Sequence, residues 1–329
     1  MFKMIKLPIN FGILFAFLIN SMGPLPAAHA SELLGLPEPG RMVALSPAHE
    51  PPIIKGVTVN RENPFQFDFI VDAGQDRLEG DALKQEGEKL IKYFLASLAI
   101  PEKELWVNLS PYEKDRTVPE ALGKTEMGRD LLAQDYMLKQ LTASLIYPKT
   151  GLGKKFWDRV YRTMANKSGP DDRGQLGKKA GNVQIPVNVF NTVWITADRA
   201  DVFARNQSAF VVKSHLKVML EEDYLAFNKS NKKERSSVAS QIIRDIILPE
   251  LEHEVNTGKN FANLRQVFNS LILATWYKRN LQQSLLNQVY ANKEKVKGID
   301  LGDPAIKEKI YQRYLQAYKK GVFNFIQEA

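Results

Sequence analysis

Apolar and polar positions alternate along three stretches of the chain, residues 65–71, 104–109 and 187–220, and this period of two predicts β-strands. Over six longer stretches apolar positions recur every three or four residues, which predicts helices at 81–99, 125–147, 152–166, 237–255, 261–290 and 304–326. The order of these elements predicts an α+β fold. An N-terminal β-α-β unit with helices precedes a C-terminal antiparallel β-meander that is packed by three long helices.

The meander is expected to turn at Ala197–Ala200 and again at Asn206–Ser208 before a long last strand. One face of that strand is expected to be buried and apolar, with Phe210, Val212, Leu216, Val218 and Leu220. The opposite face is expected to be basic and exposed, with Lys213, His215 and Lys217.

The helix at 261–290, with Asn260 as its N-cap, is expected to lie at the centre of the core. From Leu271 to Tyr277 its residues are apolar almost all round, which is typical of a helix covered on every side. This apolar stretch is too short to cross a bilayer. Trp276→Ala is therefore expected to cost about 3–5 kcal/mol of stability.

The chain is expected to begin with a secretory signal peptide at residues 1–30, because Lys3 and Lys6 precede an apolar run that ends in the small-residue cleavage site Ala28-His29-Ala30. Residues 31–62 hold five prolines and are expected to form a flexible leader without regular structure. Residues 63–329 are then expected to form a single large domain. Its possible sub-halves, 63–166 and 185–329, are separated by a glycine-rich loop.

The composition limits the chemistry that the chain can support. The chain has no cysteine, which excludes disulfides, thiolate metal sites and a cysteine nucleophile. Loss of residues 1–30 removes two basic residues and leaves 43 basic against 37 acidic residues, a net charge of +6. Such an excess is compatible with an envelope protein or an anionic polymer as the partner, although the charges are dispersed and are more typical of an ordinary solvated surface, and nucleic acid fits poorly with export. We therefore expect a periplasmic or extracellular protein with no transmembrane segment after signal cleavage.

Motifs for cofactor and metal chemistry are incomplete. Gly123-Lys124-Thr125 resembles the end of a Walker loop, but Val118 stands where its first glycine is needed, and Thr125 is better explained as a helix cap. Glu250 and His253 have the spacing of half a di-iron site, whose second half is missing. No G-x-S-x-G motif is present. We therefore expect no cofactor and no metal.

Carboxylates at strand ends are the remaining candidates for catalysis, since paired carboxylates can act as general acid and base in glycan cleavage. These candidates are Asp68, Asp72, Glu113 and Asp115. The candidates for binding are Arg116, Lys213, His215 and Lys217. A charged loop such as 113–116 is, however, usually a self-paired, solvated turn, and His215 between Lys213 and Lys217 fits an exposed basic strand face better than a catalytic base.

Five strings in the chain resemble a family of uncharacterised exported bacterial proteins. They are FDFIVDAG (67–74), the stretch 92–148 that begins KYFLASLAIP, VWITADRADVF (193–203), SHLKVMLEEDYLA (214–226) and EVNTGKNFANLRQVFNSLILATWYK (254–278). The resemblance implies export and a fold unit of similar length, and it implies no reaction, ligand or catalytic residue.

Two functional hypotheses follow. The sequence favours an exported, non-enzymatic cell-envelope protein that binds or scaffolds a partner, because it shows no nucleophile, metal or cofactor motif. The alternative is an exported carboxylate-dependent hydrolase that acts on cell-wall glycan or another extracytoplasmic polymer.

Overall fold

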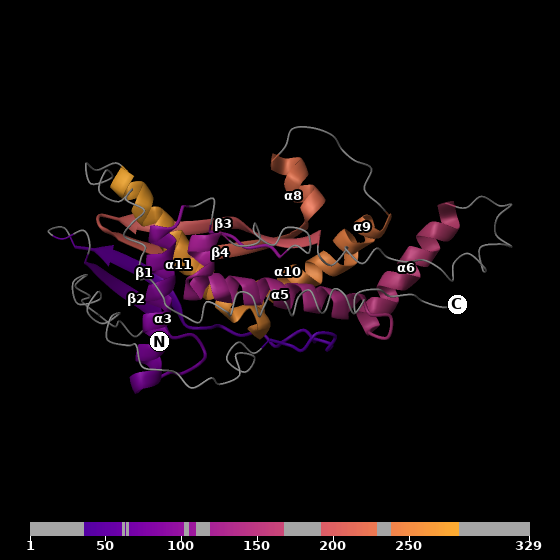
Figure 1. Ribbon diagram of the computed structural model, residues 1–329, viewed down its shortest axis with the longest axis horizontal. Coiled ribbons are helices and arrows are strands. Elements are labelled where there is room, and N and C mark those ends of the chain that lie inside the picture. Colours follow the sequence, from indigo (N-terminus) through magenta and orange to yellow (C-terminus); the bar gives the residue numbers. More distant parts are fainter. Residues whose placement is uncertain are drawn as a thin grey trace.

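A computed structural model describes residues 36–60, 63, 66–101, 105–109, 119–167, 192–228 and 238–282 (Figure 1). Several predictions lie outside these residues and are not tested by the structure. They are the signal peptide, the glycine-rich loop, the C-terminal helix and the candidates Glu113, Asp115 and Arg116.

The described strands form one antiparallel sheet with the order β2-β1-β4-β3. Their bounds are β1 (Ile53–Val59), β2 (Phe67–Asp72), β3 (Val193–Arg205) and β4 (Ser208–Leu220). Because β1 pairs with β2 on one side and with β4 on the other, this sheet joins the two expected sub-halves of the chain.

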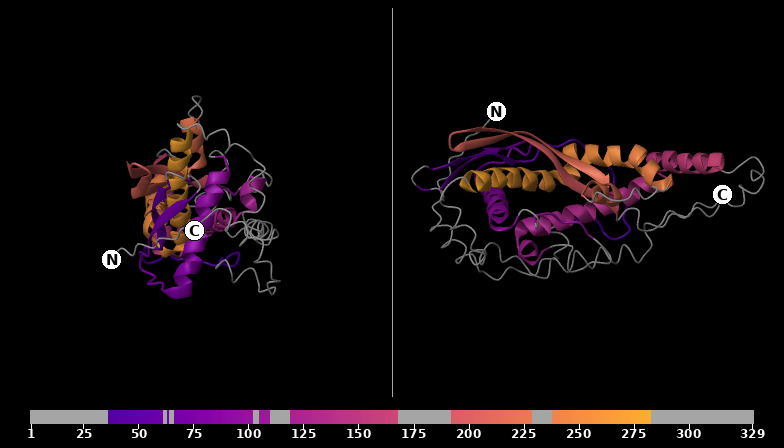
Figure 2. Two further views of the ribbon diagram at one scale, coloured as in Figure 1. Left: turned by 90° about the vertical axis from the view of Figure 1, so that its left-hand side faces the viewer. Right: turned by 90° about the horizontal axis from the view of Figure 1, so that it is seen from above.

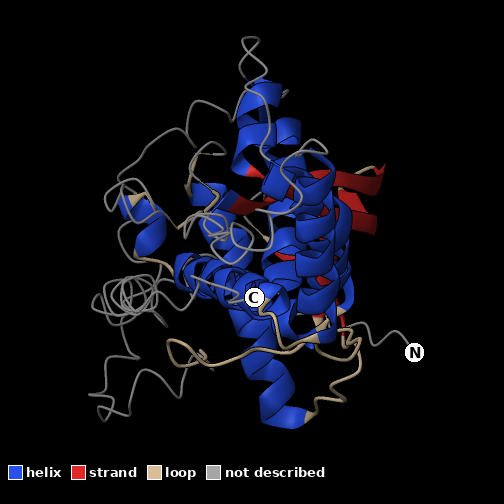
Figure 3. Ribbon diagram, turned by 90° about the vertical axis from the view of Figure 1, so that its right-hand side faces the viewer, coloured by secondary structure: helices blue, strands red, loops and turns tan. Residues whose placement is uncertain are grey.

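Helices cover one side of this sheet. Their bounds are α3 (Gly80–Ala99), α4 (Glu120–Gly123), α5 (Glu126–Ile146), α6 (Gly151–Lys167), α8 (Glu221–Asn228), α9 (Val238–Ile242), the π-helical turn η5 (Ile243–Ile247), α10 (Leu248–Thr257), the 3-10 turn η6 (Lys259–Phe261) and α11 (Ala262–Gln282). Helix α11 packs on β1 and β4 and contacts α3 and α5 on its other sides. Seen from above, α11 lies between the sheet and α5 (Figure 2). Viewed from the end near α6, most helices lie to one side of the strands (Figure 3).

The α+β class is confirmed, and so are the elements with the strongest local patterns. In β2, Phe67, Phe69 and Val71 are buried and alternate with half-buried residues. At the start of α5 the Thr125 hydroxyl accepts a hydrogen bond from the Gly128 N–H at 3.0 Å, as expected for an N-cap. Helices α3 and α6 also lie where the helical period placed them. No described helix combines the length and the apolar character needed to cross a membrane.

The expected second strand of the β-α-β unit is wrong for residues 105–109, which are irregular. Trp106 Nε1 donates to the Ile195 carbonyl of β3, and the Leu109 N–H donates to the Asp135 carboxylate on α5. Residues 105–109 are thus held by hydrogen bonds that involve side chains rather than by backbone pairing with a strand, and no parallel strand forms here. The strand pairs in the described part of the chain are all antiparallel.

The meander is a hairpin, because β3 runs without the turn expected at Ala197–Ala200. A β-bulge at Asp198 occupies that place, and β4 has a second bulge at Val212. Each bulge adds one residue and reverses which side chains face the core. Leu216, Val218 and Leu220 are buried as expected, whereas Val212 is 62% exposed and the buried residues before the bulge are Ala209 and Val211.

The leader expected without regular structure at 31–62 is wrong for residues 53–59, whereas residues 36–52 contain no helix or strand, as expected, apart from one isolated β-bridge. Residues 53–59 form the inner strand β1, and residues 36–52, here called the strap, run extended across the helices with many hydrogen bonds to them. For example, the Tyr136 hydroxyl donates to the Pro37 carbonyl, and Ala48 forms a β-bridge with Gly258. The prolines fit here because an extended strap needs few of its own N–H groups for a ladder.

The central helix is less enclosed than expected, and the part of it expected at residues 283–290 lies outside the described residues. It begins at Ala262, after η6, and Asn260 directs its side chain to the strap rather than capping α11. Leu273 and Tyr277 are fully or almost fully buried, whereas Trp276 is only half-buried. Because Tyr277 is the buried aromatic residue here, the loss of about 3–5 kcal/mol that was expected for Trp276→Ala is now expected for Tyr277→Ala. The helix expected at 237–255 is interrupted by η5, just before Pro249, which lacks an N–H for the helical ladder.

Candidate functional site

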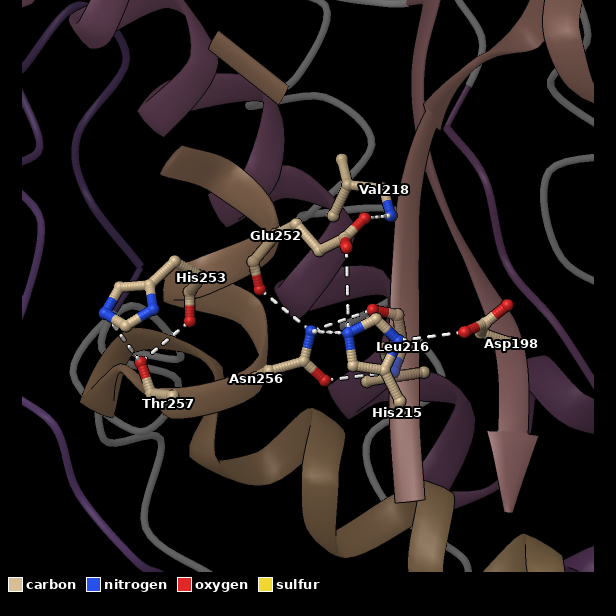
Figure 4. Close-up of polar contacts among 8 residues, drawn as sticks. All are labelled: Asp198, His215, Leu216, Val218, Glu252, His253, Asn256 and Thr257. Carbon is tan, nitrogen blue, oxygen red and sulfur yellow. Dashed lines mark hydrogen bonds and ion pairs between the residues drawn. The ribbon is translucent and has the colours of Figure 1, made fainter. Parts of the chain in front are cut away.

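The edge of β4 that faces away from β3 is only partly covered by another strand. β1 pairs with β4 at residues 208–210 only. Further along, α10 supplies the missing hydrogen bonds: Asn256 Oδ1 accepts from the Leu216 N–H at 2.9 Å, and its Nδ2 donates to the Leu216 carbonyl at 2.8 Å (Figure 4). The Glu252 carboxylate accepts from the Val218 N–H at 3.0 Å. Helix α10 therefore closes this edge with side chains.

His215, one of the binding candidates, lies beside this contact of β4 with α10 and has a carboxylate on each side (Figure 4). Its Nδ1 is 3.1 Å from Asp198 Oδ2, and its Nε2 is 3.6 Å from Glu252 Oε1. Asp198 is the extra residue of the bulge in β3, and this added residue places its side chain next to His215 on β4. We name Asp198, His215, Glu252 and Asn256 the histidine cluster.

The histidine cluster links β3, β4 and α10, because His215 of β4 has a carboxylate on each side, Asp198 from β3 and Glu252 from α10. The side chains of His215, Asp198 and Glu252 are partly exposed to solvent, at 29–39%. Within the described part of the chain, the side-chain contacts of His215 are to these carboxylates and to Asn256 Nδ2, and none is to a hydroxyl. The cluster therefore joins these three elements through charged and polar contacts, and its four residues include no hydroxyl or thiol. His253 is exposed on α10, with Nε2 3.4 Å from Thr257 Oγ1, as expected for a solvated histidine.

The outer face of the β3–β4 hairpin is the side opposite the buried Val211, Leu216 and Val218. The binding candidates Lys213 and Lys217 are exposed on it, and Arg199 lies there opposite His215. Among the residues that the structure describes, these three cations form no ion pair, although Asp201 is the cross-strand neighbour of Lys213. The hairpin thus presents cationic groups that are available to a partner.

The two described catalytic candidates do not form a pair. Asp68 and Asp72 lie four residues apart on β2, a separation of about 13 Å along an extended strand, beyond the ~5–10 Å needed for paired carboxylates. Asp72 Oδ1 also accepts a hydrogen bond from the Gly74 N–H at 3.2 Å, which stabilises the turn after β2. The structure gives Asp68 and Asp72 no shared site.

Two buried carboxylates that the sequence did not suggest lie on α5. Asp130 accepts a hydrogen bond from the Tyr93 hydroxyl of α3, and burial raises the pKa of Asp130 to about 6. Asp135 forms an ion pair with Lys139 at 3.0 Å, and burial raises the pKa of Asp135 while Lys139 lowers it in part. Both carboxylates take part in contacts between elements. The Tyr93–Asp130 hydrogen bond links α3 to α5, and Lys139, the partner of Asp135 on α5, donates to the Val193 carbonyl of β3 at 2.8 Å. Periodicity could not reveal them, because they occupy core positions of a helix.

No metal or phosphate site emerges in the described residues. They contain no group of three or more His, Asp or Glu side chains that could hold a metal ion. Thr125 caps α5 and Lys124 pairs with Glu120, so the Gly123-Lys124-Thr125 string has structural partners. A shallow recess of about 200 Å³ lies between the strap and α5, lined by Gly40, Arg41, Met42, Gln140, Ala143, Ser144 and Tyr147. The Ser144 hydroxyl in it is already bonded to the Val43 N–H and the Gln140 carbonyl.

In comparisons with known proteins, no family model, no curated protein and no solved structure matches this chain. Its function must be inferred from its own residues and geometry.

Proposed function

We propose that this is an exported, non-enzymatic binding or scaffold protein of the cell envelope, and that the outer face of the β3–β4 hairpin is its contact surface. The observation that carries the proposal is the set of three exposed cations on that face, Arg199, Lys213 and Lys217, which form no ion pair among the described residues. The large apolar side chains of Phe203 and Val212 are exposed on the same hairpin, at 56% and 62%. Cations beside exposed apolar groups suit an acidic protein surface or an anionic polymer.

The hairpin is also held in place by contacts with neighbouring helices, which suits a contact surface. The histidine cluster joins its middle to α10, and Trp194 packs on Tyr224 of α8 with a ring-centroid distance of 5.4 Å. A surface on a braced hairpin loses little conformational freedom when a partner binds. Among the described residues hydrolysis has no comparable support, since Asp68 and Asp72 lie too far apart to act as a pair.

The experiment is affinity capture of the tagged protein after crosslinking in cells, with mass spectrometry of what is bound. We expect a recurrent partner with the wild type and its loss from Lys213→Glu/Lys217→Glu. The matched control, Lys154→Glu/Lys155→Glu, makes the same charge change at exposed positions of α6 and should keep the partner. Undiminished capture by the hairpin variant, at equal thermal stability, would refute this contact surface.

Export is tested separately by cell fractionation and by sequencing the N-terminus of the purified protein. We expect a chain that starts at Ser31 in the extracytoplasmic fraction. A chain that keeps residues 1–30 and stays in the cytosol would contradict the envelope assignment.

A further inference from the structure

Strand β3 is an edge of the described sheet, and its two halves differ. In the first half, Lys139 Nζ donates to the Val193 carbonyl at 2.8 Å and Trp106 Nε1 donates to the Ile195 carbonyl at 2.5 Å. These side chains cover the outer edge there, and the bulge at Asp198 separates this half from the rest of the strand. Beyond the bulge, residues 199–205 have no such covering among the described residues. Phe203 in this second half is the most exposed aromatic side chain noted on the hairpin, at 56%.

The backbone groups that point outward from this free half follow from the pairing pattern. A two-residue loop, Asn206–Gln207, joins β3 to β4, with Arg205 opposite Ser208. The Gln207 carbonyl accepts from the Val59 N–H of β1, so alternate residues of β4, including Ala209 and Val211, direct their backbone groups toward β1. Their partners in β3, Ala204 and Val202, therefore direct their N–H and C=O groups away from the sheet.

The side chains of residues 201–205 match a reversed copy of themselves. The order is Asp201, Val202, Phe203, Ala204, Arg205. When a second copy runs antiparallel with Phe203 opposite Phe203, each Asp201 faces an Arg205 of the other copy, and Val202 faces Ala204. The outward backbone groups of Val202 and Ala204 then meet as hydrogen-bonded pairs. Charge, apolar contact and backbone direction thus agree on one arrangement.

We propose that the protein forms a homodimer in which the free half of β3 pairs antiparallel with β3 of a second copy, with the twofold axis at Phe203. The contact joins two four-stranded sheets into one and buries the exposed Phe203 pair. Because such a twofold axis is perpendicular to the sheet, both hairpin outer faces lie on the same side. The cations Lys213 and Lys217 of the two copies then form one larger surface.

Neighbouring registers satisfy fewer of these conditions. Centring the axis on Asp201 places two carboxylates opposite each other, and centring it on Val202 places Arg199 opposite Arg205. Centring it on Ala200 does match Arg199 with Asp201, but it places the bulged Asp198 in the middle of the new ladder. The charges along this edge would repel most foreign strands, which is a common protection of free edges, while they attract a correctly placed second copy.

The absence of cysteine permits a direct test of this register. Phe203→Cys introduces one thiol, and directly opposed residues of a non-hydrogen-bonded antiparallel pair have Cα atoms about 4.5 Å apart, within disulfide range. Mild oxidation of the purified full chain should give a covalent dimer on a non-reducing gel. Lys154→Cys, an exposed position on α6, is the matched control and should stay monomeric on the gel.

Charge reversal tests the same contact without crosslinking. Sedimentation equilibrium should show a dimer for the wild type, and Asp201→Arg or Arg205→Asp should each weaken it at least tenfold. Asp201→Arg/Arg205→Asp should restore the dimer, because the signs match again across the axis. Asp158→Arg on α6, also exposed, should leave it unchanged. A monomeric wild type at micromolar concentrations, dimers that persist in both single variants, or a double variant that stays monomeric would overturn the proposal.

Discussion

The side-chain amide of Asn256 forms the same two hydrogen bonds with Leu216 that the backbone of a neighbouring strand would form: its Oδ1 accepts from the Leu216 N–H, and its Nδ2 donates to the Leu216 carbonyl. Asn256 Nδ2 also donates to the Glu252 carbonyl within α10 at 2.8 Å. One residue thereby closes the sheet edge and fixes the position of α10 on β4. The sheet is completed by a helix at the point where β1 stops pairing.

Asn256→Ala is expected to destabilise the protein by about 2–3 kcal/mol, because the Leu216 backbone groups lose their partners in a partly buried place. The measurement is the urea concentration at the midpoint of unfolding. His253→Ala on the same helix serves as control, since His253 is exposed, and it should change stability by less than about 0.5 kcal/mol. Equal midpoints for the two variants would show that Asn256 does not close the edge.

Asp130 is expected to make stability depend on pH. Its pKa in the folded protein, about 6, lies above the ordinary value of 3.8, so the folded state binds more protons than the unfolded state between these values. This contribution to stability is therefore fully present below about pH 4 and is lost as the pH rises through 6.

Asp130→Asn removes this titration and keeps an oxygen that can accept from the Tyr93 hydroxyl. At pH 7 the variant is expected to be more stable than the wild type by up to about 3 kcal/mol, and near pH 4 the two should be similar. Unfolding free energies measured from pH 4 to pH 7 provide the check. A constant difference across this range would mean that Asp130 is not the titrating group.

Local patterns of the sequence were sufficient for several elements. The alternation of Phe67, Phe69 and Val71 found β2, and Thr125 with the apolar stripe after it found α5. Strand β1 escaped because a register shift near Lys55 puts Ile54 and Val57, three residues apart, both into the core. This spacing breaks the period of two, and the prolines just before Ile53 indicated a loop.

The candidate site shows the same limit. Exposure of Lys213 and Lys217 follows from their place on β4, and both were identified as binding candidates. The surroundings of His215 were missed because Asp198 reaches it through a bulge and Glu252 comes from a helix far along the chain. Bulges and distant backbone contacts leave no periodic signal in a sequence.

The buried ion pair of Asp135 and Lys139 is expected to be costly to break. Asp135→Leu leaves the Lys139 ammonium, which is fully buried, without its counter-charge and should cost about 3–5 kcal/mol. Asp135→Leu/Lys139→Met should cost at least about 1 kcal/mol less than the sum of the two single changes. The exposed pair of Lys124 and Glu120 provides a control, and Lys124→Met should cost less than about 1 kcal/mol. Simple additivity at Asp135 and Lys139 in denaturant unfolding would contradict their coupling.

The strap is expected to depend on Glu254, a carboxylate of α10 that is 2% exposed. Glu254 accepts hydrogen bonds from the Ser46 N–H at 3.0 Å, from the Ser46 hydroxyl and from Asn260 Nδ2 at 2.8 Å. Arg265 holds the same region by donating to the His49 carbonyl at 2.7 Å, and burial lowers the pKa of Arg265 to about 10 while the charge of Glu254 raises it.

Glu254→Gln is therefore expected to cost about 2–3 kcal/mol, because the amide replaces one acceptor with a donor and removes the charge that faces Arg265. The strap should open locally more often in this variant, so that trypsin cleaves after the exposed Arg41 faster under native conditions. Glu250→Gln, one turn earlier on α10, is the control, since Glu250 does not contact the strap through these bonds. Equal cleavage rates in the wild type and both variants would mean that Glu254 does not hold the strap. Faster cleavage in Glu254→Gln alone would show that these hydrogen bonds hold residues 36–52 against the helices. Deletion of residues 36–52 is then expected to destabilise the protein.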